Sequence, residues 1–111
     1  MEAIEEVKGW GTMQHLFFKN NVEICRAEIG AGKTCSKHRH KFKHNGFFVE
    51  SGKLIVRSWK GADSCQEIVL KEKDVLVVPP GVLHQFEAVE DTVAYEIYWV
   101  EIEKGDIERE V

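Results

Sequence analysis

The chain has 111 residues, of which 43% are apolar and 10% are aromatic, and its formal net charge is −4. This length and composition fit one folded domain and exclude an intrinsically disordered chain. The acidic balance argues against a nucleic-acid-binding protein, because such proteins cluster Lys and Arg against phosphates. No run approaches the roughly 18 consecutive apolar residues that a membrane-spanning helix needs.

Apolar and polar residues alternate along most of the chain, and helical periodicity is scarce. Polar residues, glycines and prolines interrupt this alternation at short intervals, as at Lys19-Asn20-Asn21, Ser51-Gly52 and Pro79-Pro80-Gly81. Short strands separated by such turn signals are typical of a sandwich or a small barrel. We therefore predict an all-β domain with strands at residues 12–18, 22–29, 45–50, 53–60, 65–70, 75–78, 84–89 and 92–101.

The two ends of the chain carry weaker signals. We expect a single domain over residues 1–111, with an N-terminal segment 1–10 and a charged tail 104–111 at its periphery. The first six residues are acidic and contain no apolar run, so we expect no secretory signal. The three cysteines are odd in number and widely spaced, which favours reduced thiols and a cytoplasmic location.

Four of the five histidines lie in two short segments. His38 and His40 are two residues apart, so in an extended strand their side chains project from the same face. His84 follows Pro79-Pro80-Gly81, a rigid corner that fixes where the next strand begins. Neutral imidazole suits Fe, Mn, Ni and Zn, so the three residues predict a site for one divalent transition metal. The alternative is a solvated basic stretch around His38 and His40, and the corner before His84 favours the metal site.

The same two segments carry a family resemblance. The spacing of Gly32, His38, His40, Asn45 and Gly52 resembles the first motif of the cupins, and Pro79-Pro80-Gly81-Val82-Leu83-His84 resembles the second. Cupins are double-stranded β-helix, or jelly-roll, barrels that hold a divalent metal inside. The resemblance therefore implies this fold, with the metal ligands His38, His40 and His84.

The chain departs from the first cupin motif at Asn45, where the family usually has a glutamate ligand. An amide lacks the negative charge of a carboxylate, so hard cations should bind less well. Asn45 could coordinate through its carbonyl oxygen, or three histidines could hold the metal alone, as in some thiol-oxidising cupins. His44 could supply a fourth nitrogen, but a shift of one residue reverses the strand face, so this needs a bulge. We expect three histidines with Asn45 nearby, and an exposed His44.

Alternation also predicts the walls of a pocket. If Asn45 and His84 face inward, then Phe47, Val49 and Phe86 face inward as well. Residues of these types line ordinary barrel cores too, so they do not identify a substrate.

The last predicted strand carries Glu96 and Tyr98 on one face, and the sequence does not decide whether that face is the inner one. Facing inward, Glu96 would be a candidate general base and Tyr98 a candidate phenolic donor. His15, in the first predicted strand, has no partner evident from the sequence, and we expect a structural role for it.

Cupins of this length resemble both sugar-isomerase-like proteins and small dioxygenases. Residues 79–91 resemble the second-motif region of mannose-6-phosphate isomerase-like cupins, which implies a metal-dependent enzyme acting on a carbohydrate or sugar phosphate. A non-haem iron dioxygenase with a three-histidine site and a non-catalytic ligand-binding cupin are the alternatives. We expect a small-molecule ligand in the barrel and a homodimer, because subunit pairing commonly covers exposed strand edges.

Overall fold

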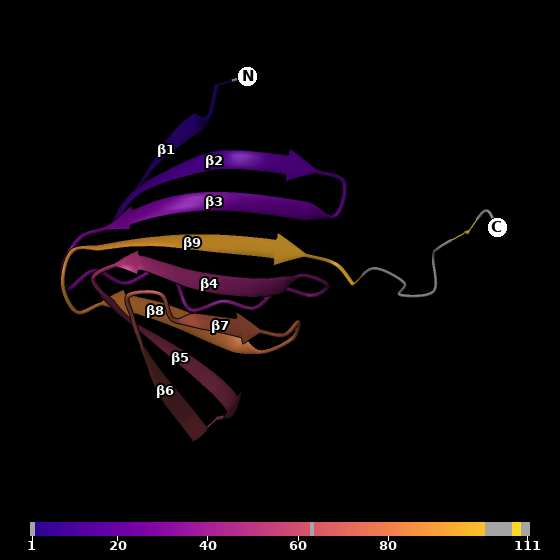
Figure 1. Cartoon of the computed structure of the whole chain (residues 1–111). Coiled ribbons are helices and arrows are strands. Elements are labelled where there is room, and N and C mark those ends of the chain that lie inside the picture. The colour runs from indigo at the N-terminus through magenta and orange to yellow at the C-terminus, as the bar shows by residue number, and fades with distance from the viewer. Residues whose placement is uncertain (1, 63, 102–107, 110–111) are drawn as a thin grey trace.

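The computed structural model describes residues 2–62, 64–101 and 108–109, which form two antiparallel sheets (Figure 1). The larger sheet has the strand order β1-β2-β3-β9-β4-β7, and the smaller has the order β6-β5-β8. The described residues include no helix, which confirms the all-β prediction. The strands are β1 (Ile4–Lys8), β2 (Gly11–Lys19), β3 (Val22–Ile29), β4 (His44–Ser51), β5 (Lys53–Gly61), β6 (Ser64–Lys71), β7 (Val75–Val78), β8 (Leu83–Ala88) and β9 (Thr92–Trp99).

Strand β9 is the centre of the larger sheet. It pairs with β3 on one side and with β4 on the other, so it joins the N-terminal hairpin β2–β3 to the strand of the first motif. Strand β8, which carries the second motif, pairs with β5 in the smaller sheet. The two motifs therefore reach the interior from opposite sheets. The described residues contain no helix that is long and apolar enough to cross a membrane.

The core lies between the inner faces of the two sheets. Phe47 and Val49 of β4 face Leu54 and Val56 of β5 and Phe86 of β8, and all five are buried. Each lies two residues from the next core residue of its strand, as the alternation predicts. Burying an apolar side chain of this size contributes about 1.5–3 kcal/mol, so these residues hold the two sheets together and give the site a fixed frame.

The N-terminal segment 1–10, expected at the periphery, forms the exposed edge strand β1 and then turns inward. Trp10 at its end is buried, and its ring meets the ring of Phe86 edge to face with 5.3 Å between centroids. The segment thus closes one end of the core. Most of the charged tail 104–111 lies outside the described residues, which include only 108–109 of it.

The β4–β5 turn generates a stability prediction. Gly52 has a φ of +92°, and a Cβ there would lie 2.5 Å from the carbonyl oxygen of Asp91. We expect Gly52→Ala to lower the free energy of unfolding by about 2–4 kcal/mol, because the left-handed backbone and the clash both oppose a side chain. Urea unfolding followed by circular dichroism measures the change.

The matched control is Gly61→Ala in the next hairpin, where a Cβ would meet no atom within 4 Å. We expect this variant to change the free energy of unfolding by less than about 1 kcal/mol. Equal destabilisation of the two variants would contradict the geometry of the β4–β5 turn.

Candidate metal centre

Three imidazole rings meet inside the barrel between the two sheets. His38 and His40 come from the connection between β3 and β4, and His84 comes from β8. We call these three residues the histidine triad. The ring centroids are 5.0 Å apart for His38 and His40, 4.7 Å for His38 and His84, and 5.4 Å for His40 and His84. One ring nitrogen from each lies within 4.8 Å of the others, so the cluster could hold a metal ion.

Backbone pairing with β8 places the first two rings. The His38 amide donates to the His84 carbonyl at 3.0 Å, and the His84 amide donates to the His38 carbonyl at 2.8 Å. His38 and His40 lie between β3 and β4 and not within a strand, although their spacing suggested one. They lie in an extended segment that one antiparallel bridge fixes against β8, and a two-residue spacing in extended backbone still puts both side chains on one face.

The turn before His84 holds the other end of this segment. The Gly81 amide donates to the His40 carbonyl at 2.8 Å, and Gly81 has a φ of +83°. This left-handed conformation suits glycine. The corner that the sequence marks with Pro79-Pro80-Gly81 thus anchors the backbone of His40 as well as starting β8.

Hydrogen bonds outside the cluster set the protonation of two rings. His38 Nδ1 lies 2.8 Å from the carbonyl oxygen of Ser36, and His84 Nδ1 lies 2.9 Å from that of Val82. A carbonyl oxygen only accepts, so Nδ1 carries the proton in both rings and Nε2 keeps its lone pair. Metal-binding histidines usually donate their second nitrogen in this way. His40 Nε2 is buried without any hydrogen-bond partner in the described part of the chain.

Asn45 on β4 completes the cluster with an oxygen. Its side chain is fully buried, and its Oδ1 lies 3.1 Å from His84 Nε2. Because His84 donates through Nδ1, its Nε2 is an acceptor, and Asn45 Oδ1 is an acceptor as well. Two buried acceptors in contact are unfavourable, and a cation bound by both atoms would remove this cost. Rotation of the amide would instead present its NH₂ group to His84 in the metal-free protein. In both orientations the Asn45 amide lies next to His84 Nε2.

His44, one residue earlier, points away from the triad. Its ring stacks on Trp99 with 5.2 Å between centroids, and its Nε2 lies 3.3 Å from a carboxylate oxygen of Glu101. β4 contains no bulge at this position that would turn the side chain inward. His44 is half-buried rather than exposed, because Trp99 covers it.

The surroundings favour the neutral form of His40 and His84. Burial, with smaller contributions from the nearby His38, Lys43 and His84, lowers the pKa of His40 to about 4. Burial also lowers the pKa of His84, against the hydrogen bond to Val82, which favours the charged form. A neutral imidazole is the form that binds metals, so the environment of these rings favours coordination over protonation.

The structure decides which face of β9 is the inner one. Glu96 is only 5% exposed, and the Tyr98 hydroxyl donates a hydrogen bond to its Oε2. The Tyr98 ring lies 5.3 Å from the ring of His40 between centroids, which places the pair beside the triad. Burial raises the pKa of the Glu96 carboxyl, and the Tyr98 hydrogen bond opposes that rise. Burial and the neighbouring Glu96 raise the pKa of Tyr98.

A cavity of about 310 Å³ opens next to these groups. Of the three residues predicted to form pocket walls, Phe86 lines it, whereas Phe47 and Val49 belong to the core behind. Several other wall residues come from the β1–β2 hairpin and the β3–β4 connection, and no local pattern of the sequence marks them as neighbours of the triad. The cavity is lined by Lys8, Gly9, Trp10, Met13, Cys35, Ser36, His38, Phe86, Glu96 and Tyr98.

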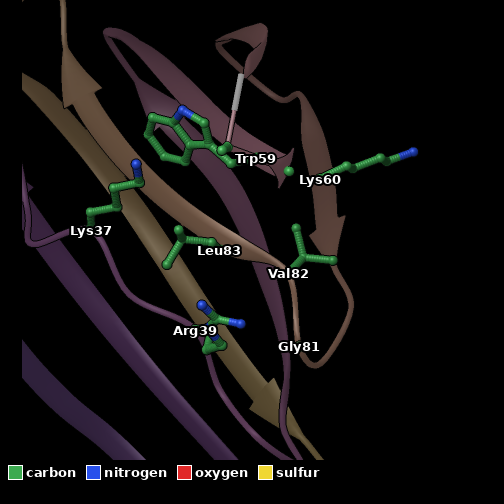
Figure 2. Close-up of a pocket in the computed structure, with 9 residues that line it drawn as sticks. Lys37, Arg39, Trp59, Lys60, Gly81, Val82 and Leu83 are labelled. Atoms are coloured by element: carbon green, nitrogen blue, oxygen red, sulfur yellow. The ribbon is translucent and has the colours of Figure 1, made fainter. Parts of the chain in front are cut away.

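Residues that alternate with the triad point the other way. Lys37 and Arg39 alternate with His38 and His40 and line an outer pocket of about 630 Å³ together with Trp59. Figure 2 shows the Lys37 amine directed toward the Trp59 ring, whose centroid is 3.9 Å from Nζ. The segment thus directs the imidazole rings of His38 and His40 toward the interior and the cationic side chains of Lys37 and Arg39 toward the outer pocket.

A family profile described as the cupin domain matches residues 25–101. The chain belongs to the cupin family. The match spans both motifs and the strands between them, so the two sheets form the jelly-roll barrel that the resemblance implied, and the predicted fold is confirmed. No curated protein matches this cupin significantly.

Solved structures share the fold at low sequence identity. KdgF from Halomonas sp. has a TM-score of 0.76 and 14% identity, covering 92% of this chain and 90% of KdgF. CapF, a capsular polysaccharide assembling protein from Staphylococcus aureus, has a TM-score of 0.75 and 22% identity, covering 96% of this chain and 30% of CapF. A variant of oxalate decarboxylase from Bacillus subtilis has a TM-score of 0.76 and 14% identity, covering 96% of this chain and 28% of that chain. The cupin thus spans under a third of the last two chains.

The buried Glu96 generates a pH-dependent prediction. Because its folded-state pKa is raised, its contribution to stability is complete below the unfolded-state pKa and is lost as pH rises through the folded-state pKa. Glu96→Gln stays neutral and can still accept the Tyr98 hydrogen bond. We expect this variant to be more stable than wild type near about pH 8 and to match it near about pH 4.

Urea unfolding across this pH range measures the difference. Glu72→Gln, at an exposed carboxylate, is the matched control and should follow wild type throughout. If Glu96→Gln were less stable than wild type at the higher pH, the ionised carboxylate would be a stabilising partner in the interior, and the prediction would be wrong.

Proposed function

We propose that this cupin is a metal-dependent enzyme, in which His38, His40 and His84 hold one divalent transition metal and Asn45 supplies a weak oxygen ligand. The observation that carries the proposal is a meeting of buried polar atoms: His40 Nε2 has no hydrogen-bond partner among the described residues, and the lone pair of His84 Nε2 faces Asn45 Oδ1 at 3.1 Å. Buried acceptors that face each other without a proton are costly unless a cation satisfies them.

The donor set supports a borderline transition metal. Three nitrogens and an amide oxygen suit Fe, Mn, Ni or Zn, whereas Mg and Ca prefer several carboxylate oxygens. No carboxylate of a described residue belongs to the cluster. A bound ion would therefore keep its full double charge in the interior and could act as a Lewis acid that polarises a carbonyl group.

We propose a carbohydrate or sugar phosphate as the substrate and proton transfer as the reaction type. Glu96 is the candidate general base: its Oε2 accepts from Tyr98, which leaves Oε1 free to take a proton from a substrate in the adjoining cavity. Burial raises the pKa of Glu96 toward the range in which a carboxylate is an effective base. The fold similarity to CapF, a capsular polysaccharide assembling protein, and the resemblance of residues 79–91 to sugar-isomerase-like cupins support this substrate class.

The second candidate is a dioxygenase that uses iron at a three-histidine site. The observation that favours it is the same lack of a carboxylate in the cluster, since three neutral ligands leave several positions exchangeable. This reading gives Glu96 no role in proton abstraction. Turnover separates both candidates from a cupin that binds a ligand without reaction.

We also propose that the cupin forms a homodimer. Strand β7 is an edge of the larger sheet, and its outward residues Val75 and Val77 are 65% and 46% exposed. Pairing of such an edge with a second copy would cover both its free backbone groups and these apolar side chains. The cytoplasmic location stays a prediction from the sequence.

Metal analysis tests the site. We expect His40→Ala and His84→Ala to lose one equivalent of bound Fe, Mn, Ni or Zn relative to wild type, measured by mass spectrometry on protein purified without a histidine tag. A ligand at 100 times its Kd stabilises the folded state by about 2.7 kcal/mol, so the metal should also raise the unfolding midpoint. His44→Ala is the matched control and should keep the metal, since its ring stacks on Trp99. Equal metal content in all four proteins would refute the proposed site.

Proton exchange tests the reaction. We expect the metal-loaded cupin to exchange the C2 proton of at least one sugar or sugar phosphate with D₂O, followed by NMR. Glu96→Gln should lower this rate by about 10²–10⁴-fold, whereas Glu72→Gln should not change it. Oxygen consumption without exchange would favour the dioxygenase, and binding with neither reaction would favour a non-catalytic cupin.

A further inference from the structure

A second cluster of donor atoms lies on strands that do not carry the histidine triad. His15 on β2 and Cys25 on β3 are register partners, and Glu23 lies two residues before Cys25 on the same face. One donor atom from each of the three lies within 4.8 Å of the others. The cluster combines a nitrogen, a sulfur and an oxygen donor, a mixture that suits a borderline-soft ion better than Mg²⁺ or Ca²⁺.

We propose that His15, Glu23 and Cys25 bind a divalent ion of the Zn²⁺ type at a site separate from the histidine triad. Three protein donors leave the fourth tetrahedral position of such an ion for water. This site goes beyond the proposed enzyme function and does not depend on it.

The separation of two donors fits a tetrahedral ion. His15 Nδ1 lies 3.5 Å from Cys25 Sγ. A tetrahedral centre with a Zn–N bond of about 2.0 Å and a Zn–S bond of about 2.3 Å would hold the two donor atoms about 3.5 Å apart. The backbone pairing of β2 with β3 sets this distance, so the two donors need no rearrangement to bind an ion.

The second ring nitrogen of His15 has a carboxylate partner, as is common for histidines that bind a metal. His15 Nε2 lies 3.0 Å from a carboxylate oxygen of Glu6 on β1. The carboxylate accepts, so Nε2 carries the proton and Nδ1 presents its lone pair toward Cys25. A carboxylate that orients a histidine in this way is a common outer partner of zinc sites. His15, expected to lack partners, therefore has one on each side.

The charges around Cys25 favour a cation. Burial and three nearby carboxylates, Glu23, Glu96 and Glu6, together raise the pKa of its thiol to about 12, against Lys43, which lowers it. A thiol in this environment is protonated and is a poor nucleophile, which argues against a cysteine–histidine catalytic pair. On metal binding the S–H bond breaks, the S–metal bond forms and the proton leaves to solvent, so no oxidant or reductant is needed.

Cobalt titration of the chelator-treated protein tests the site, because Co²⁺ bound to a thiolate gives a charge-transfer absorption that imidazole and carboxylate ligands do not give. We expect this band in wild type, with two Co²⁺ bound per chain and release of about one proton for the ion at Cys25. Cys25→Ser should lose the band and bind one Co²⁺. Glu6→Gln, which changes a positioning residue, should keep the band and weaken cobalt binding about 10-fold.

The controls separate this site from the triad. Cys35→Ser changes another buried thiol, which lies beside His38 in the cavity, and should keep the band. His40→Ala should keep the band while losing the other cobalt ion, so failure of either site is seen independently. Absence of the band in wild type, or its loss in Cys35→Ser with retention in Cys25→Ser, would overturn the proposal.

Discussion

One short antiparallel pairing fixes the geometry of the histidine triad. His38 and His84 exchange two backbone hydrogen bonds, at 3.0 Å and 2.8 Å. Both residues also belong to the triad, so the bonds that attach the β3–β4 connection to β8 set the separation of their rings at 4.7 Å. The Cys35 amide extends this pairing to the Phe86 carbonyl at 3.2 Å. An irregular segment thereby gains the positional constraint of a strand.

The triad lies in a polar interior that disfavours protonation of two of its rings. Burial lowers the pKa values of His40 and His84. Asn45 adds an oxygen but no charge, and the cations Lys37 and Arg39 face the outer pocket. A divalent ion would be the dominant charge in this region, and the cavity beside it is also lined by Glu96 and Tyr98. The barrel thus places the histidine triad, which would hold the cation, and Glu96, which can take a proton, at different points of one cavity wall.

Strand β9 lies between the second donor cluster and the core behind the histidine triad. Glu96 is the register partner of Cys25 on β3 and of Phe47 on β4. It therefore lies between the cluster of His15, Glu23 and Cys25 and the core behind the triad. This buried carboxylate raises the pKa values of Cys25 in the second cluster and of Tyr98 beside the triad.

The sequence by itself determined the all-β class, most strand positions and the identity of the inward imidazoles. Alternation by two residues and the turn at Pro79-Pro80-Gly81 are local properties of the sequence. They determine the local backbone conformation, so they predict strands and turns without knowledge of the fold. Only the tertiary structure decided that Glu96 faces the interior, that His44 stacks on Trp99, and that His15 meets Cys25. These outcomes depend on which distant strands become neighbours and in which register. That choice is made by packing of the whole barrel, which no local pattern records.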